Sequence, residues 1–128
     1  MEVSVEYIHR FLTSFAFTEI VEISVLFIFV RFALKNYFLS RVKIFFAGFL
    51  ASFATIPYVW FVFPSIANWT RESSLVVSEP FVFAVEALLY RAVLGLEVKH
   101  AFLVSLLANL SSFVLGPLLR SYGLWIYW

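Results

Sequence analysis

Long apolar runs separated by short polar segments are the main pattern of this sequence. Four such runs occur, over residues 11–34, 44–63, 80–96 and 101–119. A helix of about 20 apolar residues, with a range of roughly 17–25, crosses the hydrocarbon core of a bilayer. The chain is therefore predicted to be all-α, with one transmembrane domain over residues 1–128 in which four helices form two antiparallel hairpins.

The segments between the runs predict how the helices are joined. Residues 1–10 read as an interfacial lead-in, 35–43 as a basic link, 64–79 as a loop and 97–100 as a tight link. The opening residues lack the basic region of a signal peptide, so the first run is expected to be a retained span.

Two prolines carry a prediction of their own. Pro80 suits the first position of the third helix. Pro57 lies inside the second run and lacks a backbone N–H, which predicts a kink there. Thr55 lies close enough to satisfy the carbonyl of Phe53 that the proline leaves unpaired.

Composition narrows the class of protein. Apolar residues make up 63% of the chain and charged residues 13%, with 17 Phe among 128 residues. Soluble domains have about 45–50% apolar and roughly 25% charged residues, so an integral membrane protein is predicted. The chain has no Cys and a net charge of +1, which argues against thiolate metal sites, disulfides and nucleic-acid partners. No metal or cofactor is expected, and the lipid bilayer is the expected partner.

The basic residues predict an orientation. Six Lys or Arg flank the first and third links, and three lie on the opposite side. The first set is Arg31, Lys35, Arg41, Lys43, Arg91 and Lys99, and the second is Arg10, Arg71 and Arg120. The positive-inside rule then places both links in the cytoplasm and both termini outside a multi-pass protein of the cell membrane.

Each apolar run contains polar side chains that hydrocarbon disfavours. These are Glu19, Glu22, Thr55, Glu86, Ser105, Asn109 and Ser112. Within each run they are three or four residues apart or share a helical face with other small residues, so we expect them to face one another inside the bundle.

Two interpretations of these polar faces remain open. Small and hydroxyl residues often serve only to pack transmembrane helices, with bonds of about 0.6–2 kcal/mol each. The second interpretation is functional, because three Glu in a membrane interior are more than helix packing needs. Glu19 and Glu22 in a low dielectric should not both be ionised, so they are predicted to share a proton that can be released or replaced by a cation.

An intramembrane enzyme is a third interpretation. The CAAX-type glutamic proteases use a Glu-Glu pair on one helix with His and Asn on others. This chain has Glu19, Glu22 and Asn109, but no adjacent Glu pair, and His9 and His100 are predicted on opposite sides of the membrane. We therefore predict that the protein is not an enzyme.

The second half of the chain resembles a group of small prokaryotic four-helix membrane proteins without an assigned activity. The resemblance rests on Glu-Ala-Leu-Leu at residues 86–89, a basic link with Lys99, and Ala-Phe-Leu-Val-Ser-Leu-Leu-Ala-Asn-Leu-Ser-Ser at 101–112. It implies no activity, and it suggests that Glu86 and Asn109 face each other. The leading expectation is a proton- or cation-handling channel, transporter or transporter subunit. The alternative is a non-catalytic scaffold that holds together a homo-oligomer or another membrane protein.

Overall fold

The computed structural model describes residues 4–66 and 71–124, and all regular structure in those ranges is helical. It contains four α-helices: α1 (Val5–Ile28), α2 (Arg41–Pro57), α3 (Arg71–Leu94) and α4 (Val98–Ser121). Short helical turns extend two of them: the π-helical turn Phe29–Ala33 follows α1, and the π-helical turn Tyr58–Val62 and the 3-10 turn Phe63–Ser65 follow α2. The prediction of an all-helical chain with four helices is confirmed for this part of the sequence.

Three of these helices are long and apolar enough to cross a membrane: Val5–Ala33, Arg41–Ser65 and Val98–Ser121. Their outer faces carry large apolar side chains such as Ile20, Phe45 and Phe113, all more than half exposed, while Glu22 and Glu86 are buried. This distribution is the inverse of that in a water-soluble domain, where ionisable side chains are almost never fully buried.

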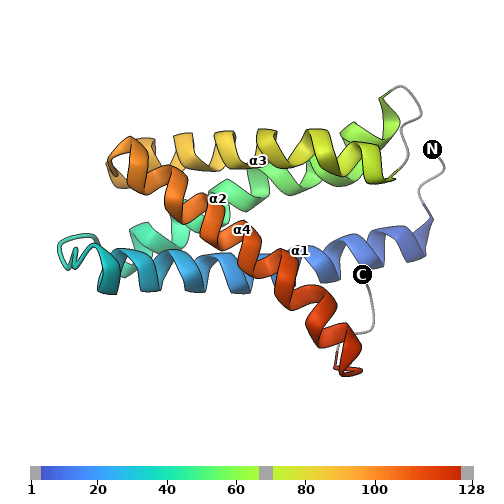
Figure 1. Ribbon diagram of the computed structural model, residues 1–128, viewed down its shortest axis with the longest axis horizontal. Coiled ribbons are helices and arrows are strands. Elements are labelled where there is room, and N and C mark those ends of the chain that lie inside the picture. Colours follow the sequence, from blue (N-terminus) through green and yellow to red (C-terminus); the bar gives the residue numbers. More distant parts are fainter. Residues whose placement is uncertain (1–3, 67–70, 125–128) are drawn as a thin grey trace.

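The helices form two hairpins packed into one bundle (Figure 1). α1 contacts α2 and α4, and α3 contacts the same two helices. α1 and α3 lie roughly along the long axis, while α2 and α4 cross it obliquely. The α1–α2 and α3–α4 links lie at one end of the molecule, which we call the link end, and the described start of α1 lies at the other.

α1 begins earlier than the sequence suggests. The Ser4 hydroxyl accepts a hydrogen bond of 3.1 Å from the Tyr7 amide and caps the helix, which starts at Val5. The lead-in predicted over residues 1–10 is therefore wrong for its second half. The prediction overlooked the cap because the apolar run itself starts only at residue 11.

α3 also begins earlier, at Arg71, so the loop predicted over residues 64–79 is wrong from that residue onward. Pro80 lies inside the helix instead of at its first position. The extra turns bury Ser74 and Ser78, which are four residues apart on one helical face. Packing of this polar face inside the bundle explains why a segment with loop-like composition is helical.

Two further prolines, Pro57 and Pro117, lie within α2 and α4. The α-helical pattern gives way to a π-helical turn straight after Pro57, where the sequence predicts a kink. The Thr55 hydroxyl donates to carbonyls of the preceding turn, not to that of Phe53. α4 continues through Pro117 to Ser121, two residues beyond the end predicted at residue 119.

The α3–α4 link is shorter than predicted, because Lys99 and His100 already belong to α4. It consists of Gly95, Leu96 and Glu97. Gly95 has a φ of +68°, a conformation that glycine adopts without strain at a helix end. Lys99 lies 3.1 Å from Glu97, and this hydrogen bond, with the charges of Lys99 and His100, lowers the pKa of Glu97.

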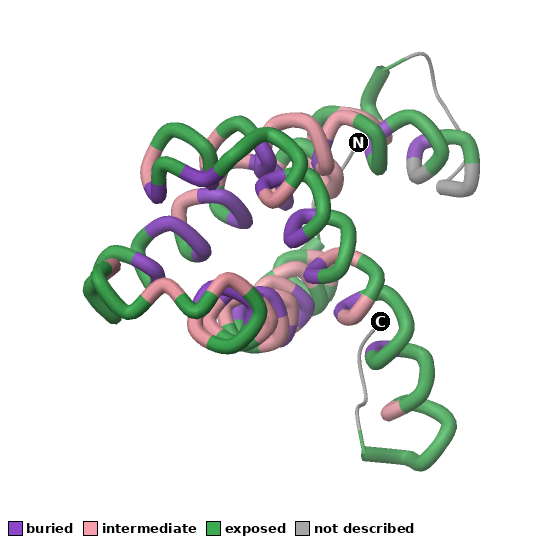
Figure 2. The backbone as a smooth tube through the Cα atoms, turned by 60° about the vertical axis from the view of Figure 1, so that its left-hand side comes forward, coloured by how far each residue is buried: buried purple, intermediate pink, exposed green. Residues whose placement is uncertain are grey.

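The hydrophobic core lies near the link end. It comprises side chains from all four helices, including Leu26, Val30, Ile44, Tyr90 and Val104, none of which is exposed. At the opposite end the bundle is looser. The second half of α4 diverges from the other helices and is mostly exposed (Figure 2).

Candidate functional site

Glu22 lies where α1, α2 and α4 meet and is only 1% exposed. Each of its carboxyl oxygens accepts a hydrogen bond from a serine. Ser52 Oγ donates to Oε2 over 2.8 Å, and Ser112 Oγ donates to Oε1 over 3.0 Å. A carboxylate has about four acceptor positions, so roughly two remain for another donor.

Glu86 on α3 forms a second polar centre with α2 and α4, and it is completely buried. Thr55 Oγ1 donates to Oε1 over 3.2 Å, and Ser105 Oγ donates to Oε2 over 3.2 Å. Asn109 Nδ2 also donates to Oε2. With Glu22, this centre links all four helices through hydrogen bonds to carboxyl groups.

Glu19 stands apart from both centres. Its side chain is buried, yet neither carboxyl oxygen has a hydrogen-bond partner among the described residues. The Tyr90 hydroxyl is also buried and has no hydrogen-bond partner in the described part of the chain. Glu19 and Glu22 are close enough for their charges to interact, but no hydrogen bond joins them, so the predicted shared proton has no direct path. Glu22 is similarly close to Glu86.

The hydroxyl groups around Glu22 have a second acceptor each. Ser52 Oγ lies 3.3 Å from the Gly48 carbonyl oxygen, and Ser112 Oγ lies 3.0 Å from that of Asn109. A hydroxyl can rotate its single hydrogen between acceptors and can itself accept. Each serine can thus donate to an ionised Glu22, or donate to the helix carbonyl while accepting from a protonated Glu22. Both protonation states of Glu22 keep their hydrogen bonds.

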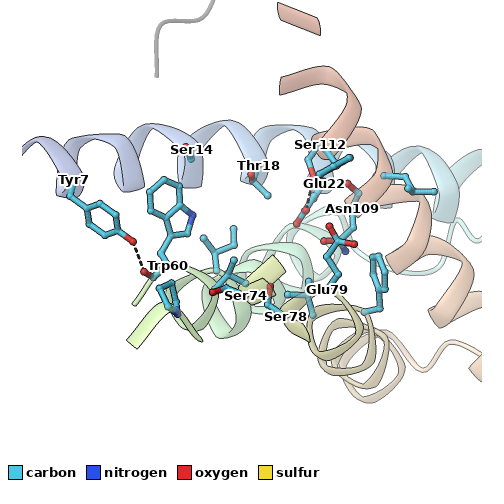
Figure 3. A pocket seen from close by; sticks show the side chains of 17 residues that line it. Tyr7, Ser14, Thr18, Glu22, Trp60, Ser74, Ser78, Glu79, Asn109 and Ser112 are labelled. Atoms are coloured by element: carbon cyan, nitrogen blue, oxygen red, sulfur yellow. Dashed lines mark hydrogen bonds between the residues drawn. The ribbon is translucent and has the colours of Figure 1, made fainter. Parts of the chain in front are cut away.

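A cavity of about 440 Å³ extends from these centres towards the end opposite the links (Figure 3). Glu22, Asn109 and Ser112 lie at one end of it, and Tyr7 and Trp60 at the other. The Tyr7 hydroxyl donates to the Trp60 carbonyl oxygen. Further polar residues along its wall come from α1 and α3: Ser14, Thr18, Ser74, Ser78 and Glu79.

The structure brings most of the residues predicted from the sequence into one region. Those at the two carboxyl centres are Glu22, Thr55, Glu86, Ser105, Asn109 and Ser112. Glu22 lines the cavity, whereas Glu19 and Glu86 do not. The predicted pairing of Glu86 with Asn109 across the hairpin is present.

Some residues that line the cavity were not predicted from the sequence. Ser14 and Thr18 precede Glu22 at intervals of four, so their common helical face could have been recognised from spacing alone. Ser74 and Ser78 could not, because their segment was assigned to a loop. Trp60 lies near the end of the second apolar run, and nothing in the sequence indicates that it reaches a cavity.

The described parts of the chain contain no preformed set of metal ligands. Residues 4–66 and 71–124 contain no group of three or more His, Cys, Asp or Glu arranged to hold a metal ion. His9 is near the start of α1, and His100 is in the first turn of α4 at the link end. The two histidines therefore lie at opposite ends of the bundle.

Comparison of this chain with protein-family models, with curated proteins and with solved structures finds no match. The resemblance to small prokaryotic membrane proteins, based on residues 86–89 and 101–112, therefore stays a prediction, and the function must be inferred from the geometry of the site.

Proposed function

We propose that this protein is a four-span protein of the cell membrane that handles protons or cations through its buried carboxylates, as a small channel, a transporter or a transporter subunit. Three apolar helices of sufficient length support the membrane location. α3 has 24 residues, which span about 36 Å at 1.5 Å per residue, and serves as the fourth span.

The arrangement of the links supports an orientation. Both hairpin links lie at the same end of the bundle, and the basic residues that flank them gather there as a result. In the proposed orientation this end faces the cytoplasm, and the cavity opens towards the outside. The two termini, residues 1–3 and 125–128, lie outside the described residues and are extracytoplasmic in this proposal.

The observation that carries the proposal is the position of Glu22. It is almost fully buried, yet it lines a cavity large enough for several water molecules. An ionisable group inside a membrane is costly and usually marks an ion or proton pathway. A carboxyl group that exchanges protons needs both a low-dielectric setting and a route to water; the burial of Glu22 supports the first and its place in the cavity wall supports the second.

The neighbouring carboxyl of Glu86 strengthens this argument. Glu22 and Glu86 are close enough for their charges to interact, and no Lys or Arg within the described ranges forms an ion pair with either. Two ionised carboxylates in a dry interior repel each other and lose hydration. Uptake of one proton or one cation at Glu22 relieves both costs, and the rotatable serine hydroxyls accommodate either state.

Difference infrared spectroscopy of the protein in lipid vesicles tests the proposal. We expect a protonated-carboxyl band that changes with pH and disappears in Glu22→Gln, whereas Glu19→Gln and Glu86→Gln identify any bands of the other two groups. Glu97→Gln, on the exposed link, is the control and should leave the band unchanged. A band that is the same at every pH, or one that Glu22→Gln leaves intact, would overturn the proposal.

A second function is favoured by a different observation. Glu86 does not line the cavity, and three donors from two other helices satisfy it. Such a centre suits a non-catalytic scaffold, in which carboxyl groups act as hydrogen-bond hubs that fix the helices and any oligomer or membrane partner. The same spectra separate the two: sealed carboxyl groups give bands that do not respond to pH.

A further inference from the structure

We propose that the cavity binds an amphipathic organic ammonium ion, with its charged head at Glu22 and its apolar body between aromatic side chains. This inference rests on the proposed function and deepens it, because it names the class of cation that competes with the proton at Glu22. The charge, the walls and one unsatisfied polar group of the cavity each support it.

The charge of the cavity favours a cation. Among the described residues, its lining includes the carboxyl groups of Glu22 and Glu79 and no Lys, Arg or His. Ser52 and Ser112 occupy only about half of the acceptor positions of Glu22. An ammonium head has donors for the remaining positions, and hydrogen bonds between charged groups are roughly twice as strong as neutral ones.

The walls favour an organic body over a hydrated metal ion. Aromatic side chains from α1, α3, α4 and the π-helical turn after α2 line the cavity: Tyr7, Trp60, Phe83 and Phe113. The volume of about 440 Å³ falls within the range of roughly 300–1,000 Å³ typical of small-molecule sites. A bare ion would fill little of it and leave the apolar walls without a partner.

An unsatisfied hydroxyl provides the second polar contact. Ser14 lines the cavity, is 2% exposed, and its hydroxyl has no hydrogen-bond partner among the described residues. Buried polar groups normally have a partner, so the Ser14 hydroxyl is free to bond a ligand group in the cavity. Ser14 precedes Glu22 by two helical turns, about 12 Å along α1. The ligand we infer therefore has an ammonium head and a hydrogen-bonding group further along its body.

Three probes that share a pyrene ring test the charge requirement: pyrenylmethylammonium, pyrenylmethanol and pyrenylacetate. The protein is reconstituted in phosphatidylcholine vesicles, where it is the only source of Trp fluorescence, and energy transfer from Trp to pyrene reports binding. Non-fluorescent benzylammonium, added in excess, separates saturable binding from partition into lipid. We expect the ammonium probe to bind at least about tenfold more tightly than the alcohol, and the carboxylate probe to bind most weakly.

Matched variants assign the site. Glu22→Gln should abolish the preference for the ammonium probe, whereas Glu97→Gln should keep it. Ser14→Leu fills part of the cavity and should weaken the binding of the ammonium probe and of the alcohol probe equally. Ser24→Leu, on the exposed face of α1, should leave the binding of both unchanged. Circular dichroism verifies that each variant is folded.

The outcomes distinguish this inference from the proposed function. A preference for the ammonium probe that survives Glu22→Gln, or binding that Ser14→Leu does not weaken, overturns the inference. If the probes show no charge preference while the infrared band of Glu22 still responds to pH, proton handling stands and the organic cation is excluded. If the ammonium probe binds through Glu22 but the band never responds to pH, the inference holds and proton handling fails.

Discussion

Replacement of Asn109 by Leu should destabilise the bundle only while Glu86 is present. Asn109 donates one of the three hydrogen bonds that the buried Glu86 carboxyl accepts, and Thr55 and Ser105 donate the others. Leu has a similar volume and cannot donate. The substitution therefore leaves a buried acceptor with two hydroxyl partners instead of three.

The size of the effect follows from the type of bond. Hydrogen bonds to charged groups contribute about 1.5–3 kcal/mol in soluble proteins. Bonds between transmembrane helices average about 0.6 kcal/mol and reach about 1.7. We take the upper end of the membrane range, about 1.5 kcal/mol. Glu86 is completely buried, so no water can replace the hydrogen bond that Asn109 donates. The value of about 1.5 kcal/mol corresponds to roughly a tenfold change in the unfolding equilibrium.

The same Asn109→Leu substitution should cost little once Glu86 has been replaced by Leu. When Glu86→Leu removes the acceptor, each of its three donors still has a backbone carbonyl within hydrogen-bond distance. Asn109→Leu should then cost less than about 0.5 kcal/mol in the Glu86→Leu background, which is the usual limit of additivity between independent sites. The free-energy cost of losing the Asn109 donor is therefore expected to depend on whether the Glu86 acceptor is present.

A double-mutant cycle measures this coupling. The parent, both single variants and the double variant are unfolded with sodium dodecyl sulfate in mixed micelles, and helicity is followed by circular dichroism. Ser111→Ala serves as the control, because its hydroxyl donates to the Leu107 carbonyl within α4 and should cost the same with or without Glu86. Equal costs of Asn109→Leu in both backgrounds would refute the assignment of Asn109 to the Glu86 centre.

Three further substitutions test other parts of the structure. Gly48→Ala would place its Cβ 2.7 Å from Ile23 Cγ1, so a loss of about 1–2 kcal/mol is expected in the same unfolding assay, after the gain in helix propensity. Arg31→Lys cannot span the two carbonyl groups that Arg31 binds after α1; faster amide hydrogen exchange in the α1–α2 link should result, and unchanged exchange would contradict it. Lys99→Gln should return the pKa of Glu97 towards its ordinary value in an NMR titration. Since the lowered pKa adds stability above the unfolded pKa, the difference between this variant and the parent should vanish as the pH falls through the folded value.

Helix number and type could be predicted from the sequence because apolar runs long enough for a bilayer are unambiguous. Helix ends could not, because they depend on single side chains and on tertiary packing. The Ser4 cap adds a turn and a half to α1 ahead of its apolar run. The buried faces of Ser74 and Ser78 extend α3 into a segment whose composition resembles a loop.

The polar centres were partly predictable for a related reason. A carboxyl or amide in an apolar run must turn inward, so the grouping of Glu22, Glu86 and Asn109 follows from spacing and depth. Spacing along one helix does not determine which partner each group finds. Glu19 and Glu22 are three residues apart and seemed a natural pair, yet Glu22 bonds to serines of α2 and α4, and Glu19 bonds to none of the described residues.

The position of Glu22 between the cavity and the core makes access to it one-sided. Towards the link end, the space beyond Glu22 is filled by Leu26, Val30, Ile44 and Val104, none of which is exposed. In the function we propose, protons and cations would therefore reach Glu22 through the cavity in this conformation. Passage across the whole protein requires a second conformation in which these helices separate near the links. Without one, the site we propose would take up and release its ligand on one face, as in a sensor or a subunit that delivers cations to a partner.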